Sequence, residues 1–155
     1  SPGASGAPGA SGDGPGGRVT AVRNPDYRRG QGTSLARGVR ALEAAGVPGV
    51  AVLLGDEPGV RPDDVRRVVE AWQEEPGAVA RARYADRPGH PVVFPAERFA
   101  ALRALEDAED DRGGRVCLRR LEREGRAVRE VRLPHEGPAD VDTRRDYERA
   151  RREGG

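Results

Sequence analysis

The strongest constraint on the fold is an uninterrupted apolar run at residues 50–54 (VAVLL), which precedes a helical pattern. A run of this length is typical of a strand covered on both faces, as in parallel sheets. The following pattern opens at Pro62 with Asp63 and Asp64 in its first turn. Its apolar positions recur at helical spacing: Val65, Val68, Val69 and Trp72. Together they predict a buried strand followed by an amphipathic helix.

The same alternation runs along most of the chain. Further strands are predicted at residues 18–23, 78–84, 91–94 and 128–133. Further helices are predicted after residues 30–33 as far as Gly46, and over residues 96–105, 115–124 and 143–152. Strand–helix alternation at this spacing predicts βαβ units, and hence an α/β fold with a Rossmann-like layered sheet.

Residues 1–17 differ in composition from the rest of the chain. They are almost wholly Gly, Ala, Ser and Pro, and Asp13 carries the only charge. Such a segment cannot bury enough apolar area to offset its chain entropy. We therefore expect a disordered linker or tail over residues 1–17 and one globular domain over residues 18–152.

The composition excludes several classes of protein. The formal net charge is +1, from 27 basic and 26 acidic residues, so we expect no nucleic-acid footprint. No apolar run approaches the ~20 residues of a membrane span, and we expect no membrane partner. The single cysteine, Cys117, fits a reducing cytoplasm and makes a cysteine-based metal site implausible. Because the chain contains no methionine, we expect a processed product or a fragment.

Asp56 follows the apolar run directly, in the sequence LLGDEP. Ligands of open α/β sheets bind beyond the carboxyl ends of the strands. A carboxylate at that place suits Mg²⁺, which takes one or two protein carboxylates and keeps several waters. Asp and Pro also favour turns, so Asp56 could simply begin the turn over residues 55–58. The residues alone leave both interpretations open.

A second acidic pair, Asp140 and Asp142, follows the predicted strand at residues 128–133. Asp142 or Thr143 could cap the last helix, with Asp146 in its first turn. Taken alone, capping is the favoured interpretation. It does not explain why a second aspartate stands at position 140, so a ligand role stays open.

Two weaker signals complete the set of candidate residues. Gly30 and Gly32, with Thr33 and Ser34, stand before the first helix, where free amides and close backbone approach favour an anion or a base edge. His90 lies between Gly89 and Pro91, and a histidine in such a turn is more often a surface residue than a catalyst.

Five segments, in this order, resemble consecutive motifs of the MobA-like NTP transferases. They are residues 24–35 (NPDYRRGQGTSL), 54–58 (LGDEP), 89–94 (GHPVVF), 111–115 (DRGGR) and 140–143 (DVDT). Within that family the segments resemble those of the molybdenum cofactor cytidylyltransferases, and the resemblance covers residues 18–151. It implies a three-layer, GT-A-like nucleotidyltransferase fold.

The resemblance also implies an activity, its partners and residue roles. A nucleoside monophosphate, with CMP favoured, would pass from CTP or GTP to molybdopterin or another phosphorylated acceptor, and pyrophosphate would leave. Asp56, Asp140 and Asp142 would hold Mg²⁺ or Mn²⁺, with Asp56 and His90 as the catalytic residues and His90 near the acceptor. The residues against the nucleotide would be Gly30, Gly32, Thr33 and Ser34.

One departure from the family pattern limits these expectations. Family members open with a strand and a glycine-rich loop that bears arginine and lysine, whereas this chain contains no lysine and shows only residues 1–17 in that place. We therefore expect a domain that lacks its first strands, with unpaired strand edges that favour self-association and with feeble catalysis. The alternatives are a truncated, non-catalytic module that binds a nucleotide or a protein, and an interaction protein with an unrelated βαβ fold.

Overall fold

The computed structural model describes residues 11–14, 17–107, 114–126 and 128–154. Its α-helices are α1 (Gln31–Glu43), α2 (Pro62–Glu74), α3 (Phe99–Arg103), α4 (Gly114–Arg123) and α5 (Arg144–Glu153). Its strands are β1 (Ser11–Gly14), β2 (Gly17–Thr20), β3 (Gly49–Val52), β4 (Val79–Arg83), β5 (Pro88–Pro95) and β6 (Val128–Arg132). Three 3-10 helices complete the set: η1 (Tyr27–Arg29), η2 (Ala96–Arg98) and η3 (Ala104–Asp107).

The main sheet has four strands in the order β3-β5-β4-β6. β5 is antiparallel to both β3 and β4, and β6 is parallel to β4. We expected the apolar run at β3 to lie among parallel strands. For the described strands this expectation is wrong, because the described partner of β3 is the antiparallel β5. The physical reason is the tight turn between β4 and β5, closed by a hydrogen bond of 2.9 Å from Tyr84 N to Arg87 O, which makes a hairpin and so reverses the direction of β5.

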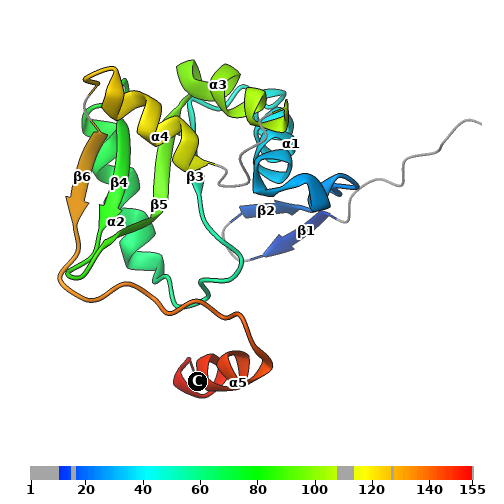
Figure 1. Cartoon of the computed structure of the whole chain (residues 1–155), viewed down its shortest axis with the longest axis vertical. Helices are drawn as coiled ribbons and strands as arrows, with labels where there is room; N and C mark the ends of the chain where they lie inside the picture. The colour runs from blue at the N-terminus through cyan, green and yellow to red at the C-terminus, as the bar shows by residue number, and fades with distance from the viewer. Residues whose placement is uncertain (1–10, 15–16, 108–113, 127, 155) are drawn as a thin grey trace, which may run out of the picture.

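Helices cover the sheet on both faces, which confirms the predicted layered α/β fold (Figure 1). Val92 and Phe94 of β5 point into one apolar cluster, which α1, α3, η3 and α4 complete. Val93, between them, points into the opposite cluster, which α2 completes. The alternation of side chains along one strand thus supplies both cores.

The packing of α2 follows from its predicted pattern. Pro62 occupies the first turn, and Val68 and Trp72 are buried against the sheet. Gly49 allows this approach, since a Cβ atom there would lie 2.8 Å from the Trp72 ring. A residue larger than glycine would push α2 away from β3.

β3 is the edge strand of the described sheet, with β5 as its one described neighbour. Its residues are only half-buried, and Leu53, just beyond it, is 46% exposed. Leu42 of α1, on the same side, is 38% exposed. The expectation of an unpaired strand edge with exposed apolar side chains therefore holds for the described residues.

Among the described residues before α1, none belongs to a strand of the main sheet. β1 and β2 pair only with each other among the described strands, and Val19 is 65% exposed (Figure 1). The strand predicted at residues 18–23 is observed as β2, which ends at Thr20. Ser11–Gly14, which we expected in a linker, forms β1, while residues 1–10 and 15–16 lie outside the described residues.

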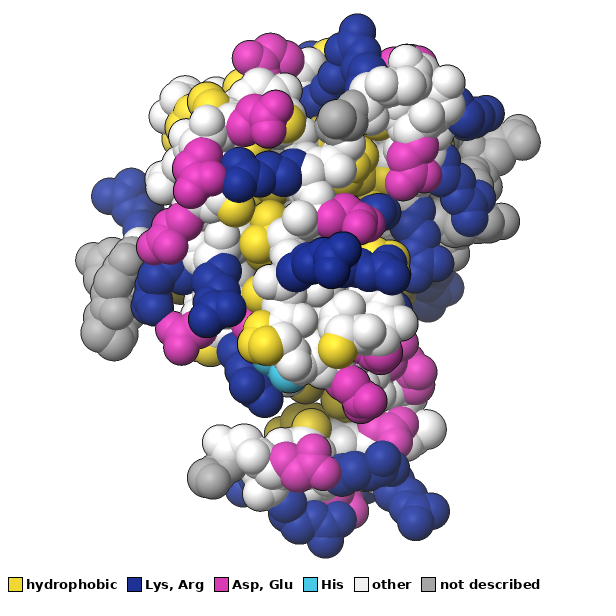
Figure 2. Space-filling view, turned by 90° about the vertical axis from the view of Figure 1, so that its left-hand side faces the viewer, with side chains coloured by type: hydrophobic (Ala, Val, Ile, Leu, Met, Phe, Trp, Pro, Cys, Tyr) yellow, Lys and Arg dark blue, Asp and Glu magenta, His cyan; other side chains and the backbone are white. Residues whose placement is uncertain are grey.

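α5 forms a knob below the body of the molecule, with arginine side chains at its outer surface (Figure 2). Thr143 caps it in a capping box: its hydroxyl accepts from Asp146 N at 3.1 Å, and Asp146 Oδ2 accepts from Thr143 N at 3.1 Å. None of the described residues of α5 is buried. No helix in the described parts of the chain is both long enough and apolar enough to cross a bilayer.

Candidate functional site

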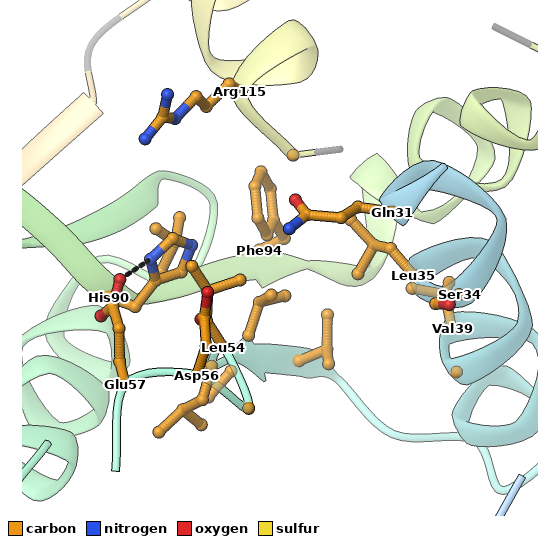
Figure 3. Close-up of a pocket in the computed structure, with 18 of the residues that line it drawn as sticks. Gln31, Ser34, Leu35, Val39, Leu54, Asp56, Glu57, His90, Phe94 and Arg115 are labelled. Atoms are coloured by element: carbon orange, nitrogen blue, oxygen red, sulfur yellow. Dashed lines mark ion pairs between the residues drawn. The ribbon is translucent and has the colours of Figure 1, made fainter. Parts of the chain in front are cut away.

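A cavity of about 720 Å³ lies along β3, between α1 and the loops at the end of the sheet. One end is apolar, and Figure 3 shows Leu35 and Val39 of α1 on that side, with Phe94 of β5 at the back. The other end is polar and carries Asp56, Glu57, His90, Arg115 and Asp140. The cavity therefore joins an apolar wall to a charged rim.

The direction of the strands explains why the polar residues meet. β3 and β4 are both antiparallel to β5, and β6 is parallel to β4, so β3, β4 and β6 run the same way. Their carboxyl ends share one edge of the sheet, and β5 begins at that edge. Asp56 follows β3, Asp140 follows β6, and His90 stands near the start of β5. Residues far apart in the sequence are thus brought to one rim.

Three carboxylates form a compact group at this rim. One oxygen each from Asp56, Glu57 and Asp140 can be chosen so that all lie within 4.8 Å of one another. Val141 N donates a hydrogen bond of 2.8 Å to Asp56 O, which fixes the two chain segments side by side. Clustered carboxylate oxygens are the ligands that Mg²⁺ and Mn²⁺ prefer, so the donor set fits a hard divalent cation.

The Glu57 carboxylate is partly buried and lies beside two other negative charges. Its side chain is only 12% exposed. Burial raises the pKa of Glu57 above its ordinary value, and the negative charges of Asp140 and Asp56 raise it further, against the opposing effect of Arg87 and Arg115. A cation placed among the three carboxylates would remove the repulsion between them.

His90 borders the carboxylates, with its Nδ1 atom 3.9 Å from Glu57 Oε1 (Figure 3). Burial lowers the pKa of His90, and the nearby Arg115 lowers it further, while Asp56 acts in the opposite direction. The neutral imidazole is therefore favoured near pH 7. In that form one ring nitrogen can donate a hydrogen bond and the other can accept one.

Tyr84 holds the backbone at His90. Its hydroxyl donates a hydrogen bond of 2.6 Å to His90 O, and its ring is 2% exposed. Burial, followed by the charges of Asp64 and Glu57, raises the pKa of Tyr84 to about 12, so the hydroxyl keeps its proton at neutral pH. Gly89 leaves room for this ring, since a Cβ atom there would lie 2.9 Å from Tyr84 Cε2.

Arg115, at the start of α4, extends toward the polar end of the cavity, where His90 and Glu57 also lie (Figure 3). A guanidinium group there can bind phosphate oxygens through paired N–H donors. It belongs to the motif at residues 111–115, of which Asp111, Arg112 and Gly113 lie outside the described residues.

Of the residues expected before the first helix, Gly30 precedes α1, whereas Gly32, Thr33 and Ser34 lie within its first turn. Gly30 precedes the helix with φ 129°. A Cβ atom at Gly32 would lie 2.7 Å from Leu105 O, so this glycine is explained by the packing of α1 against η3. Thr33 is 2% exposed, and its hydroxyl donates to Gly30 O at 2.7 Å. Packing explains Gly32 and a local hydrogen bond explains the Thr33 hydroxyl. None of Gly30, Gly32 and Thr33 is among the described residues that line the cavity, and their contact with a nucleotide stays a prediction.

Ser34 does line the cavity, and so does Gln31, which sequence reasoning did not single out (Figure 3). Both side chains are exposed, and Ser34 Oγ accepts a hydrogen bond of 2.8 Å from Asn24 Nδ2. A sequence signal could have identified Gln31: it lies in the first turn of the helix, on the face away from the core.

Asp142 stands outside the carboxylate group, and Glu57 takes the place that we expected it to fill. The physical reason is its position next to Thr143, where the chain turns away from the rim to begin α5. Glu57 could have been found from the sequence, because it follows Asp56 in the same turn.

The layered sheet and the acidic rim define an α/β domain that places its polar residues beyond the carboxyl ends of its strands. The sequence model of the MobA-like NTP transferase domain matches residues 8–126. This chain belongs to the MobA-like NTP transferase family.

Relatives support the same assignment. The purine catabolism protein PucB of Bacillus subtilis (strain 168) is 32% identical over 127 residues, which are 82% of this chain and 58% of PucB. A Mycobacterium sp. strain JC1 homologue of the Mycobacterium tuberculosis protein Rv0371c is 28% identical, with TM-score 0.59, over 76% of this chain and 57% of that one. Rv0371c from M. tuberculosis H37Rv in complex with manganese is 30% identical, with TM-score 0.55, over 72% and 58%. The chain thus spans less than two thirds of these relatives.

Proposed function

We propose that this chain forms the cation-binding part of a nucleotidyltransferase that uses a nucleoside triphosphate, with CTP as the first candidate. The acceptor would be a phosphorylated molecule of the molybdopterin type. The observation that carries the proposal is the convergence of Asp56, Glu57 and Asp140 at the rim of the cavity. Membership of the family supports the triphosphate, and the manganese complex of Rv0371c supports a divalent cation.

Asp56 and Asp140, with Glu57 beside them, are the proposed ligands of Mg²⁺ or Mn²⁺. Such a cation, when bound, neutralises charge on the triphosphate and stabilises the oxygens of the transition state. In the reaction, an acceptor oxygen forms a bond to the α-phosphorus while the bond from that phosphorus to the bridging oxygen breaks. The electron pair of the broken bond leaves with pyrophosphate.

The remaining rim residues have proposed roles in binding. His90, as the neutral imidazole, would position the acceptor through a hydrogen bond. Arg115, at the same polar end of the cavity, would bind phosphate oxygens. Ser34 and Gln31 would lie against the nucleotide at the start of α1. The support for these proposed roles is that all four side chains line the cavity.

A second candidate function is a module that binds nucleotide without turnover. Two observations favour it: Arg115 is the only cationic side chain among the described residues that line the cavity, and β3 leaves one strand edge open. Phosphoryl chemistry at a triphosphate normally uses several positive groups. Pyrophosphate release in the presence of an acceptor separates the two functions.

The proposal is tested by calorimetric titration of CTP and GTP in the presence and absence of Mn²⁺. We expect binding that requires Mn²⁺, favours CTP, and is lost in Asp56→Asn and in Asp140→Asn. Asp63→Asn is the matched control, because Asp63 is an exposed aspartate whose described partner is Arg66. Equal binding by Asp56→Asn and the unchanged chain would refute the proposed cation site.

A further inference from the structure

Residues 134–141, here called the β6 rim segment, carry Asp140 from the end of β6 to the carboxylate group (Figure 1). Contacts from distant parts of the chain hold this segment. Ala85 N donates to His135 O at 2.9 Å, and Gly137 N donates to Asp86 Oδ1 at 2.7 Å. Ala85 and Asp86 lie in the turn between β4 and β5, so this hairpin supports one side of the segment.

A histidine and an aspartate hold the other side. His135 Nε2 lies 2.9 Å from Asp64 Oδ1 and 2.9 Å from Asp64 Oδ2. His135 Nδ1 lies 2.9 Å from the carbonyl oxygen of Glu136. A carbonyl oxygen can only accept, and so can a carboxylate, so both ring nitrogens act as donors. This geometry is satisfied by the imidazolium form of His135.

Asp64 is placed so that it needs this partner. It is 4% exposed, in the first turn of α2, and its Oδ2 atom has no hydrogen-bond donor of good geometry among the described residues. The helix N-terminus favours a negative charge there, but a buried carboxylate also requires a counter-charge. The described group that supplies it is His135, while the neighbouring Asp63 is exposed and pairs with Arg66.

We propose that His135 and Asp64 are positioning residues whose ion pair fixes the β6 rim segment on the first turn of α2 and so places the Asp140 carboxylate beside Asp56. The chain from His135 to Asp140 is short, so a shift of the segment at His135 also moves the Asp140 carboxylate. The next residue, Val141, donates a hydrogen bond of 2.8 Å from its N atom to Asp56 O. The cation part of this proposal rests on the proposed function.

The pair also makes the arrangement sensitive to pH. The hydrogen bond from Asp64 raises the pKa of His135 above its ordinary value, and the carbonyl of Glu136 adds to the effect; burial and Arg61 oppose it. The other group that faces the ring is Tyr84, whose ring centroid is 5.5 Å away and which stays neutral because its pKa is about 12. Because the pKa of His135 is raised in the folded state, the stabilisation by the ion pair is complete below the unfolded-state pKa. It is lost as the pH rises through the folded-state pKa.

The first test is hydrogen exchange of the cation-free protein, followed by mass spectrometry, for Asp64→Asn, His135→Gln and the control Asp63→Asn. Asp64→Asn keeps the shape of the side chain and removes only its charge. We expect lower protection factors over residues 134–141 in Asp64→Asn and His135→Gln, with β4 and β5 unchanged as the folding control. In the unchanged chain the same protection should fall as the pH rises through the raised pKa of His135, whereas in the two variants it should not change with pH. Unaltered protection in both variants would overturn the proposal.

The second test is the affinity of the same proteins for Mn²⁺, followed by electron paramagnetic resonance. Loss of a residue that orients a ligand typically weakens metal binding by about 10-fold to 100-fold. We expect the Mn²⁺ affinity to fall about 10-fold in Asp64→Asn and His135→Gln, and not to change in Asp63→Asn. Faster exchange with unchanged Mn²⁺ affinity would overturn the positioning role and leave the proposed function intact. No Mn²⁺ binding by the unchanged chain would instead refute the cation site, and the positioning role with it.

Discussion

Two stretches of chain meet at the rim of the cavity, and they are held in different ways. The turn at residues 53–60, which carries Asp56 and Glu57, is closed by hydrogen bonds within itself, such as Glu57 N to Leu54 O at 3.3 Å. The β6 rim segment is held by groups from α2 and from the turn between β4 and β5. One carboxylate pair is therefore placed by local sequence, and the third carboxylate by the tertiary fold. A site built this way is complete only when the whole sheet has formed.

The largest expected effect is at the locally placed pair. Glu57→Gln removes one of three adjacent negative charges, so Mn²⁺ affinity should fall by up to about 100-fold. In the cation-free protein the same change should raise stability, because it removes a buried charge and the repulsion from Asp140 and Asp56, which together raise the pKa of Glu57. Urea unfolding with and without Mn²⁺ measures both effects. A variant that is less stable without the cation would contradict the repulsion that we infer.

Tyr84→Phe is expected to have the next largest effect. It removes the hydroxyl that donates to His90 O and leaves a carbonyl without its partner, at a cost of about 1–3 kcal/mol in the free energy of unfolding. Urea denaturation provides the measurement. Tyr147→Phe is the matched control, because Tyr147 is 58% exposed on α5. If both variants lost the same stability, Tyr84 would have no special part in holding the start of β5.

A smaller effect is expected at the cap of α5. Thr143→Ala removes the hydroxyl that accepts from Asp146 N and should destabilise α5 by about 1 kcal/mol. Amide exchange within α5 should rise, while Mn²⁺ affinity should not change, because Asp142 and Thr143 lie outside the carboxylate group. Thr143→Ser should keep the cap. Weaker Mn²⁺ binding in Thr143→Ala would show that the cap and the cation site are coupled.

The smallest effect is expected at Asp86, whose carboxylate supports the β6 rim segment from the hairpin side. The Gly137 N–H lowers the pKa of Asp86, and its own backbone and Arg87 add to this against burial. Because the pKa of Asp86 is lowered in the folded state, the stabilisation by its contact with Gly137 is complete above the unfolded-state pKa. It is lost as the pH falls through the folded-state pKa. Asp86→Asn should therefore raise exchange at the Gly137 amide only a few-fold at pH 7. The unchanged chain should approach the variant in acid, and a difference that persisted there would contradict this assignment.

How much the sequence could predict follows the same division. The apolar run at residues 50–54 and the pattern at Val68 and Trp72 depend on neighbours along the chain, so β3 and α2 were predicted close to their observed bounds. The strand at residues 18–23 was predicted too long, because alternation cannot show whether a partner covers it. The antiparallel partner of β3 was missed, because strand direction is set by the turn that follows Tyr84.

The site divides in the same way. Asp56 and Asp140 could be selected because each follows a strand, and the structure brings them together. Asp142 was selected because the segment at residues 140–143 resembles a family motif, and it lies outside the group, whereas Glu57 was overlooked within its own turn. His135 gave no signal in the sequence, because its partner Asp64 is distant along the chain and meets it only through the packing of α2. Contacts of that kind depend on tertiary structure, which periodicity does not encode.

The central claim is that the turn after β3 and the β6 rim segment hold one cation together. It is tested most directly by adding Mn²⁺ in small amounts to ¹⁵N-labelled protein and following the broadening of backbone amide signals. We predict that the amides of Asp56, Glu57, Asp140 and Val141 broaden together at the same low Mn²⁺ concentration, and that this stops in Asp56→Asn. Broadening confined to one of the two stretches, or different concentration dependence for each, would contradict the shared site.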